Sequence, residues 1–415
     1  MKVLISAYSC QPNCGSEAGN GWNWAWHLAE LGHEVWVLTL IDNQTAIESE
    51  LILHPIPNLH FIYVAIPQWI KRYIRISIGD FGWQSEYLGW QQKASKIAHQ
   101  LDGQHGFDII HHVTWASITG GSRLWRLNKP FVFGPVGGGQ VAPPLFKQYF
   151  LSHQWRKEAL RSFIFQKLAQ FNLFSRQTVS QADLVLATNS ETYDLARQLG
   201  ANRVELAAVI GIAQNYIPPE LPTRSTSPEL RLLWVGSPIP TKACPLALEA
   251  LAKVDSQVPW KLTVVGFSNS NHDLIKLIKK LGIEDQVNCK GRISWSELKQ
   301  EYLRSDVFLF TSLRNSLGAQ LFEAMACGLP IITLDHQGAK DFVPQGAGIK
   351  VPVTNPTETI NLLAQAVEDM YHNPQTRESM SKFGYEFAKT QTWSHKAQKM
   401  SRYYEELTKS SAVKI

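Results

Sequence analysis

The stretch SLRNSLGAQLFEAMACGLPIITLD, residues 312–335, encodes a loop, a short helix and a strand in direct succession. Polar residues and Gly318 are typical of a loop that opens a helix, and Gly328 stands where a left-handed C-cap is favoured. Pro330 then leads into an apolar, β-branched run. Loop, helix and strand in this order are typical of an α/β protein with a parallel sheet.

The helix of this stretch carries one acidic residue, Glu323. Apolar residues recur at helical spacing on one face, which predicts that Glu323 lies on the opposite face and is free to meet a ligand. The helix N-terminus would hold phosphate near Gly318 and Ala319, because its amides are free and carry about half a positive charge. Glu323 could then accept two ribose hydroxyls, and its removal should leave stability nearly unchanged. A surface helix with one solvated Glu is the alternative.

These residues resemble the signature of the family 4 retaining glycosyltransferases of the GT-B fold, in which an acidic residue, seven spacers and a Glu run into EAMACGLP. Glu323 to Pro330 match that ending letter for letter. The resemblance implies two Rossmann-like domains facing across a cleft, with the ribose on Glu323 and the donor sugar at Asn315. Asn315 replaces the family's acid, so it can hydrogen-bond a sugar hydroxyl but brings no charge.

Length and composition indicate a two-domain globular protein. The chain has 415 residues, more than one hydrophobic core usually supports. Its net charge of +5 suits anionic substrates or an acidic membrane surface, and its Lys/Arg pattern does not argue for nucleic acid. Five scattered cysteines predict neither a disulfide framework nor a metal site. With no signal peptide and no long apolar run, we expect a cytoplasmic protein.

Strand-like and helix-like segments alternate along both halves of the chain. Strands are predicted at 2–7, 34–40, 59–64, 107–111, 131–133, 184–187, 231–235, 260–265, 286–289, 307–310 and 331–333. Capping patterns predict helix starts at Ser294 and Asn355. The polar, proline-rich stretch near 218–228 indicates a linker. We therefore expect an acceptor-binding domain over 1–217, a linker over 218–230 and a nucleotide-sugar-binding domain over 231–391. The resemblance implies that a helix over 392–415 crosses back to the first domain.

The loop after the first strand contains Gly15, Ser16 and Glu17, a glycine loop without the GxGxxG spacing. It resembles the loop that meets the donor phosphates in a bacterial branch of the family. We expect Glu17 on the acceptor or sugar side of the site; its alternative is a first-turn acid that complements the helix dipole. His111 or His112 ends the fourth strand, and only one of them can face a ligand because strand side chains alternate. The family has a donor-sugar histidine here; His111 aligns slightly better, and a structural histidine is the alternative.

Two further loops carry glycine. Gly137, Gly138 and Gly139 follow a strand, where the backbone must bend sharply or approach another molecule, and Gln140 replaces an acid of the bacterial branch. The resemblance implies that these four residues lie on the acceptor or sugar side. In the second half, the resemblance to a Gly-Arg, spacer, Lys-Gly pattern places Gly236 and Lys242 at the donor diphosphate. Ser237 stands where Arg is expected and Ala243 where Gly is. Arg314 and Arg292 are the available substitute cations, and an ordinary surface arginine is the alternative for each.

Two segments, 69–83 and 144–174, interleave aromatic and basic residues. They fit an interfacial surface for peripheral membrane contact at the inner face of the plasma membrane, or else ordinary amphipathic helices. The resemblance implies a retaining transferase that moves a sugar from a UDP-, GDP- or ADP-linked donor to a glycan or lipid-linked acceptor, with no metal or cofactor. The alternatives are a binding protein that has lost transfer, because three expected charges are missing, and a sugar-nucleotide epimerase.

Overall fold

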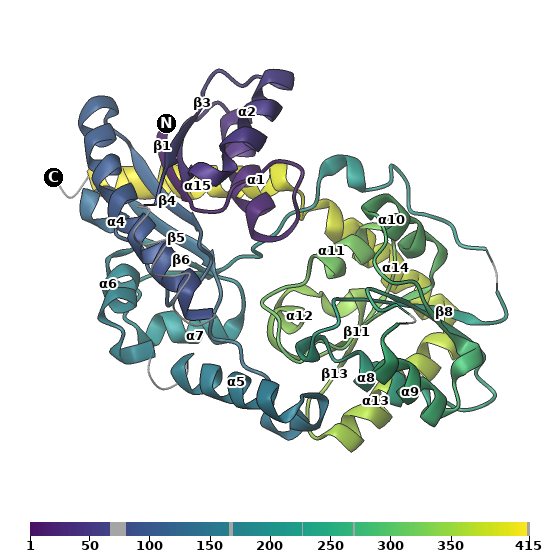
Figure 1. The fold of residues 1–415 in the computed structure, drawn as a ribbon. Helices are drawn as coiled ribbons and strands as arrows, with labels where there is room; N and C mark the ends of the chain where they lie inside the picture. Colours follow the sequence, from purple (N-terminus) through teal and green to yellow (C-terminus); the bar gives the residue numbers. More distant parts are fainter. Residues whose placement is uncertain (67–79, 166–168, 226, 269, 413–415) are drawn as a thin grey trace. The chain divides into compact units, whose positions relative to one another are not determined.

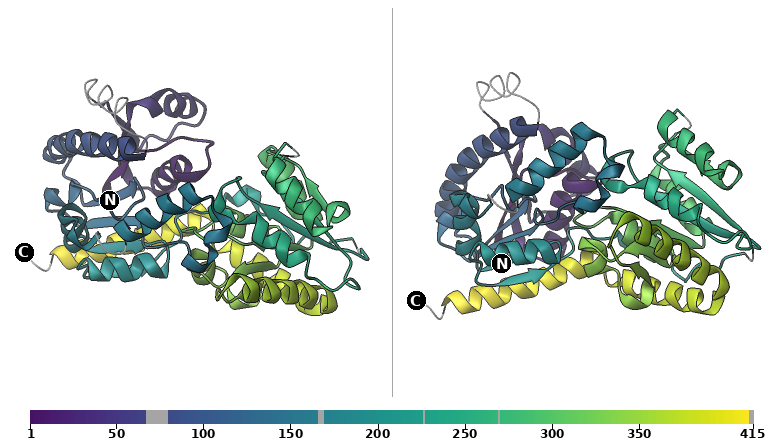
Figure 2. Two further views of the ribbon diagram at one scale, coloured as in Figure 1. Left: turned by 60° about the horizontal axis from the view of Figure 1, so that its bottom comes forward. Right: turned by 90° about the horizontal axis from the view of Figure 1, so that it is seen from below.

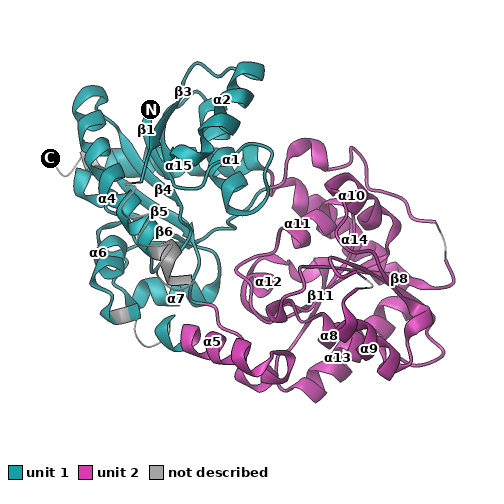
Figure 3. Cartoon of the chain, in the orientation of Figure 1, with its two compact units in different colours: residues 1–139, 163–211, 393–415 teal, residues 140–162, 212–392 magenta. Residues whose placement is uncertain are grey.

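The computed structural model describes residues 1–66, 80–165, 169–225, 227–268 and 270–412. The chain forms two compact units, one of residues 1–139, 163–211 and 393–415, the other of residues 140–162 and 212–392 (Figure 3). Each unit is a parallel sheet covered by helices (Figure 1). In the described part of the chain, no helix combines the length and the apolarity needed to cross a membrane.

The sheet of unit 1 has the strand order β3-β2-β1-β4-β5-β6-β7. Its strands are β1 (Lys2–Ala7), β2 (Glu34–Leu40), β3 (Leu59–Val64), β4 (Ile109–Thr114), β5 (Phe131–Val136), β6 (Leu184–Ala187) and β7 (Val204–Leu206). Its helices include α1 (Ser16–Glu30), α2 (Gln44–Leu53), α4 (Asp80–His105), α6 (Leu173–Gln181) and α7 (Ser190–Gln198). The strand predicted at 107–111 begins at Ile109 and continues to Thr114, because β4 pairs with β1 as far as Ala7.

The last helix, α15 (Trp393–Ala412), belongs to unit 1 and lies beside α1 (Figure 2). Trp24 of α1 meets Trp393 edge to face, with ring centroids 5.7 Å apart. Tyr404, fully buried, reaches the sheet and bonds His111 of β4. The end of the chain therefore completes the core of the first unit.

The sheet of unit 2 has the order β10-β9-β8-β11-β12-β13. Its strands are β8 (Leu230–Val235), β9 (Trp260–Val265), β10 (Val287–Cys289), β11 (Val307–Phe310), β12 (Ile331–Leu334) and β13 (Gly348–Val351). Its helices are α5 (Ser152–Phe163, whose last residue is in unit 1), α8 (Cys244–Leu251), α9 (His272–Leu281), α10 (Trp295–Arg304), α11 (Ala319–Ala326), α12 (Gln337–Phe342), α13 (Pro356–His372) and α14 (Pro374–Lys389). The predicted caps are confirmed: Ser294 and Glu297 form a capping box, and the Asn355 side chain accepts from Glu358 N.

The segment 140–162 packs in unit 2, although the sequence suggested that it belongs with the first 217 residues. Phe146 and Phe150 join the core of unit 2, and Trp155 packs against it. The Tyr149 hydroxyl donates to Glu249 of α8 over 2.6 Å. Much of the aromatic content of 144–174 is therefore core packing in this segment, as the alternative reading held. The companion segment 69–83 lies largely outside the described residues.

The proline-rich stretch after unit 1 is anchored along unit 2 and does not run free as a linker. The chain enters unit 2 at Ile212, before the expected boundary at 218. Tyr385 donates to Pro218 O over 2.6 Å, and Arg224 donates to Ser305 O and Cys327 O over 2.5 and 2.7 Å. These bonds satisfy carbonyls that end α10 and α11, so the stretch also caps helices.

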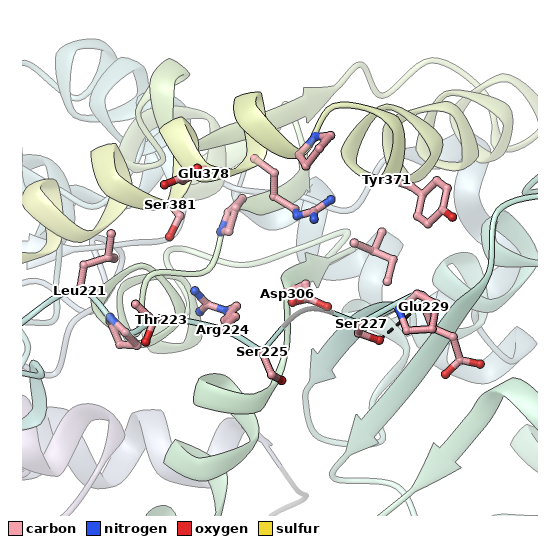
Figure 4. A pocket seen from close by; sticks show the side chains of 16 residues that line it. Leu221, Thr223, Arg224, Ser225, Ser227, Glu229, Asp306, Tyr371, Glu378 and Ser381 are labelled. Carbon is pink, nitrogen blue, oxygen red and sulfur yellow. Dashed lines mark hydrogen bonds between the residues drawn. The ribbon is translucent and has the colours of Figure 1, made fainter.

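A pocket of about 630 Å³ is lined by residues 221–225 and 227–230, by Asp306 and Pro330 just before β11 and β12, by Tyr371 of α13 and by residues of α14 (Figure 4). Leu230 and Asp306 place it at the amino ends of β8 and β11. Its Arg224 is committed to the two carbonyls described above, and Arg231 pairs with Asp306 over 2.7 Å. Ligands of open parallel sheets bind at the opposite, carboxyl ends. The pocket is therefore not the candidate site.

Candidate functional site

The candidate donor site of unit 2 lies where its strand order reverses, between β8 and β11. Both strands are parallel and adjacent, so their carboxyl ends deliver loops 236–243 and 311–318 to one place. Leu313 N and Arg314 N donate to Thr241 O over 2.8 and 3.3 Å, which ties the two loops together. The fold thus brings together the signature and the glycine-lysine loop, which are more than seventy residues apart in sequence.

The N-terminus of α11 offers free backbone amides. Gly318 is its N-cap and makes no side-chain cap bond. A Cβ at Gly318 would lie 2.7 Å from Gln320 Oε1 and 3.1 Å from Asn315 Nδ2, so the loop is closely packed around this glycine. The amides that follow, beginning at Ala319, can hold an anion.

Helix α11 is not a surface helix with one solvated Glu, which was the alternative to a ligand-binding Glu323. Leu321, Phe322, Ala324, Met325 and Ala326 are all buried, so apolar packing surrounds most of the helix. Its circumference is buried because α10 and α14 pack on it as well as the sheet. Glu323 is only partly exposed rather than solvated.

The carboxylate of Glu323 lies among aromatic side chains. The Tyr302 hydroxyl, fully buried on α10, donates to Glu323 Oε2 over 3.0 Å. Burial raises the pKa of Glu323, while hydrogen bonds from Tyr302 and Trp295 lower it. Trp295 stacks on Tyr216 with ring centroids 4.9 Å apart. We expected the removal of Glu323 to leave stability nearly unchanged. The hydrogen bond from Tyr302 argues against this expectation, because the buried Tyr302 hydroxyl would lose its acceptor. No local pattern had singled out Tyr302, because its contact with Glu323 exists only once α10 packs on α11.

Lys242 ends the short 3-10 helix Pro240–Lys242. Its Nζ lies 5.6 Å from the centre of the Phe310 ring. Burial, and then the nearby positive charge of Arg314, lower the pKa of Lys242 to about 8. The next residue, Ala243, has φ +48°, a left-handed conformation that explains why the family pattern has Gly at this position. Lys242 therefore presents a largely desolvated cation that gains from binding an anion.

The positions with altered charge differ in their surroundings. Ser237 is exposed, and Gly236 before it is buried, where a Cβ would lie 2.6 Å from the Trp234 ring. Asn315 N donates to Gln337 Oε1 over 2.8 Å. Asn315 Nδ2 is buried and finds no hydrogen-bond acceptor among the described residues. A buried, unpaired amide is costly, so this group is poised to donate to a ligand.

Gln140, which the sequence placed in the first domain, lies in unit 2 against the signature loop. Its Nε2 donates to Ser316 Oγ over 2.9 Å, and Gln337 Nε2 donates to Val141 O over 2.7 Å. Arg161 NH1 donates to Gln140 O over 3.0 Å. The amide at 140 therefore supports the loop that carries Asn315, a role that only the packing of segment 140–162 reveals.

In unit 1 the strand order reverses between β1 and β4, and the glycine loop follows β1. Gly15 is the N-cap of α1 without a side-chain cap bond, and Ser16 has φ +60°. Glu17 Oε1 accepts from Ala116 N over 2.5 Å, and burial raises the pKa of its carboxyl. Glu17 thus joins the loop after β1 to the loop after β4, which goes beyond a simple interaction with the helix dipole.

The two histidines of β4 are both fully buried, but their rings differ in hydrogen bonding. His111 Nδ1 contacts the Tyr404 hydroxyl and Nε2 contacts Gly134 O, each over 2.6 Å. His112 Nε2 contacts Trp115 O over 3.0 Å, while its buried Nδ1 has no hydrogen-bond partner among the described residues. Burial lowers the pKa of His111 to about 3 and that of His112 to about 4, so both are neutral. His111 is a satisfied structural histidine, which leaves His112 as the candidate of the pair.

The three glycines at 137–139 pack closely against other backbone segments of unit 1. A Cβ at Gly139 would lie 2.3 Å from Glu191 O, and Gly139 N donates to Thr192 Oγ1 over 3.1 Å. Gly138 has φ +138° and Gly137 forms a parallel bridge with Ser117. The run therefore lets the backbone turn against α7 just before it leaves unit 1.

Comparisons with known proteins agree over nearly the whole chain. The family model for Glycosyl transferases group 1 matches residues 222–387, and that for Glycosyltransferase Family 4 matches residues 22–209. The MMP alpha-(1->4)-mannosyltransferase of Mycolicibacterium hassiacum is 22% identical over 346 residues, 80% of each chain.

Two solved structures share the fold. Sucrose-phosphate synthase from Thermosynechococcus elongatus has a TM-score of 0.67 at 18% identity, covering 99% of this chain and 100% of that one. Anabaena HepE in complex with UDP has a TM-score of 0.64 at 17% identity, covering 98% and 100%. With two family models matched in succession and the fold shared over its full length, the chain belongs to the family 4 glycosyltransferases of the GT-B fold.

Proposed function

We propose that this enzyme transfers a sugar from a UDP-sugar to a hydroxyl of a glycan or lipid-linked acceptor, with retention of anomeric configuration and without a metal ion. The observation that carries the proposal is the meeting of Lys242, the free N-terminus of α11 and Glu323 at the strand reversal of unit 2. The UDP bound to the related HepE fold supports uracil as the base.

In the proposed donor complex the α11 amides and Lys242 bind the diphosphate, and Glu323 accepts the ribose hydroxyls. Asn315 Nδ2, which has no acceptor among the described residues, donates to a hydroxyl of the sugar. These donors stabilise the charge that develops on the leaving diphosphate. Because cations and amides supply this stabilisation, the reaction needs no divalent metal.

In the proposed transfer step the bond between the anomeric carbon and the β-phosphate oxygen breaks. The acceptor oxygen forms its bond to the same face of that carbon, and its proton passes to a phosphate oxygen of the leaving group. At the strand reversal of unit 1, Glu17 belongs to the acceptor side, while Gly15 and Ser16 are assigned to the donor phosphates and His112 to the donor sugar, as the resemblance implies. The product fits synthesis of a cell-surface polysaccharide or glycolipid in the cytoplasm.

Peripheral membrane contact fits the exposed part of segment 140–162. Leu145, Leu151 and Leu160 are 62%, 60% and 55% exposed, beside Lys147 and Lys157. Such apolar and basic side chains bind anionic lipid surfaces. Sedimentation with anionic vesicles but not with neutral ones is expected, and equal binding to both would exclude the electrostatic part.

The test of function is donor hydrolysis with UDP-, GDP- and ADP-sugars in the presence of EDTA. We expect slow hydrolysis of a UDP-sugar, abolished by Glu323→Ala and unaffected by Glu284→Ala, an exposed glutamate. NMR of the first product should show the donor's anomeric configuration. Nucleotide binding without turnover would instead support the second candidate, a nucleotide-sugar-binding protein, which the uncharged Ser237 and Asn315 favour. Formation of an epimerised sugar would indicate an epimerase.

A further inference from the structure

The donor site lacks a cation where the family pattern has one. Ser237 is an exposed hydroxyl residue in place of the expected Arg. Lys242 alone supplies a point charge, without the forked donors of a guanidinium. A diphosphate carries two negative charges, so a second cation close to Lys242 is expected for tight binding.

Arg314 reaches the same place from the neighbouring loop. Its backbone N–H and that of Leu313 both donate to Thr241 O, directly before Lys242. Ser312 Oγ also donates to Thr241 O, over 3.1 Å. The positive charge of Arg314 helps to lower the pKa of Lys242, which shows that the two cations lie within electrostatic reach. Arg292, the other substitute considered, is exposed on the loop after β10.

A buried carboxylate holds Arg314. Glu158 of α5 lies with its Oε1 2.8 Å from Arg314 Nε, and its side chain is only 7% exposed. The Nη1 atom of Arg161, one turn later on α5, lies 3.9 Å from the same Glu158 Oε1. Because Phe150 and Trp155 pack α5 and the segment before it against the core of unit 2, Glu158 has a fixed position. The described residues offer no hydrogen bond to Arg314 Nη1 and Nη2, so its terminal fork is available to a ligand.

The charges of this cluster match a diphosphate. Lys242, Arg314 and Arg161 are cations, and Glu158 is the carboxylate that the structure pairs with two of them. Burial, and then the positive charge of Arg314, lower the pKa of Arg161, while Glu158 raises it, so the two guanidinium groups repel each other within the cluster. Lys242 and Arg314 are two cations at the place where a nucleotide sugar would bring the two negative charges of its diphosphate. A repulsive cluster of this kind is relieved when an anion binds.

We propose that Arg314 replaces the arginine absent from position 237 as the guanidinium that binds the donor diphosphate, and that Glu158 is its positioning residue. The inference rests on the proposed donor site in unit 2. It assigns a role to segment 140–162, which brings a carboxylate from the first half of the chain to the signature loop.

The experiment is calorimetric titration with UDP and with uridine. Arg314→Ala should weaken UDP binding roughly 10- to 100-fold and leave uridine binding unchanged, since a charge-assisted bond to phosphate is lost. Glu158→Gln should weaken UDP binding by a smaller factor, again without an effect on uridine. A merely structural role of Glu158 would weaken both ligands. Arg292→Ala is the matched control and should change neither.

Rescue makes the test decisive. Ser237→Arg in the Arg314→Ala background should restore most of the UDP affinity. If Arg314→Ala does not fold, the double variant Glu158→Gln/Arg314→Met removes the buried charge with its partner and should still show the selective loss of UDP binding. Undiminished UDP affinity in these variants, with binding still abolished by Glu323→Ala, would overturn this inference alone. No nucleotide binding by the wild type would instead overturn the proposed donor site.

Discussion

The assignment of Glu323 to the ribose can be tested by changing the ribose hydroxyls of the ligand and, separately, by replacing Glu323 with alanine. In the structure Glu323 accepts the Tyr302 hydroxyl at one oxygen and is partly exposed, so it can also accept from a ribose. A hydrogen bond from a hydroxyl to a carboxylate contributes about 1.5–3 kcal/mol, or roughly 10- to 150-fold in affinity. Wild-type protein should therefore bind 2′-deoxy-UDP or 3′-deoxy-UDP more weakly than UDP by such a factor.

In Glu323→Ala this discrimination should vanish, because the acceptor of both hydroxyls is gone. Calorimetric titration of both proteins with UDP and the two deoxynucleotides measures how much each hydroxyl contributes to affinity with and without the Glu323 carboxylate, and Glu284→Ala is the control. The variant should also lose about 1–3 kcal/mol of stability, since the buried Tyr302 hydroxyl is left unpaired; Glu323→Ala/Tyr302→Phe should recover part of it. If Glu323→Ala discriminates between UDP and its deoxy forms as strongly as wild type, the ribose assignment is wrong.

Three further predictions concern the other residues of the site. Lys242→Met should weaken UDP binding far more than uridine binding; it should also raise the ligand-free Tm near pH 7, because burial lowers the pKa of Lys242 to about 8 and the charged form is therefore destabilising. Since Lys242 loses its charge above this pKa, the UDP affinity of the wild type should fall as pH rises through about 8, and a flat pH profile would contradict a phosphate contact. Asn315→Ala should reduce donor hydrolysis with little change in UDP affinity, whereas equal hydrolysis by both proteins would argue against a sugar contact. Gly139→Ala should destabilise the protein by about 2 kcal/mol or more in chemical denaturation, because the new Cβ would lie 2.3 Å from Glu191 O. Gly103→Ala on α4 has open space around it and should stabilise the protein by about 0.5–1 kcal/mol, so similar effects of the two changes would refute the close approach at Gly139.

Much of the fold was predictable because its signals are local. Buried parallel strands are near-continuous apolar runs, and β1, β2, β3, β6, β9 and β11 have the bounds that their sequence pattern predicts. The caps at Ser294 and Asn355 depend on side chains that bond backbone amides only a few residues away, so they could be read in the sequence. The short strands β7 and β13 were missed, because three- and four-residue strands offer too little pattern.

The signature stretch 312–335, which contains EAMACGLP from Glu323 to Pro330, pointed to the family by itself, because it encodes a loop, a helix and a strand with the candidate ligand residues Asn315, Gly318 and Glu323 in one run. Tertiary structure alone decided which histidine of β4 is satisfied, because Tyr404 comes from the other end of the chain. It also decided that residues 140–162 pack on unit 2 and bring Gln140 and Glu158 to Ser316 and Arg314. Contacts between residues more than one hundred and fifty positions apart depend on how helices pack on a sheet, and no local spacing of residues records that packing.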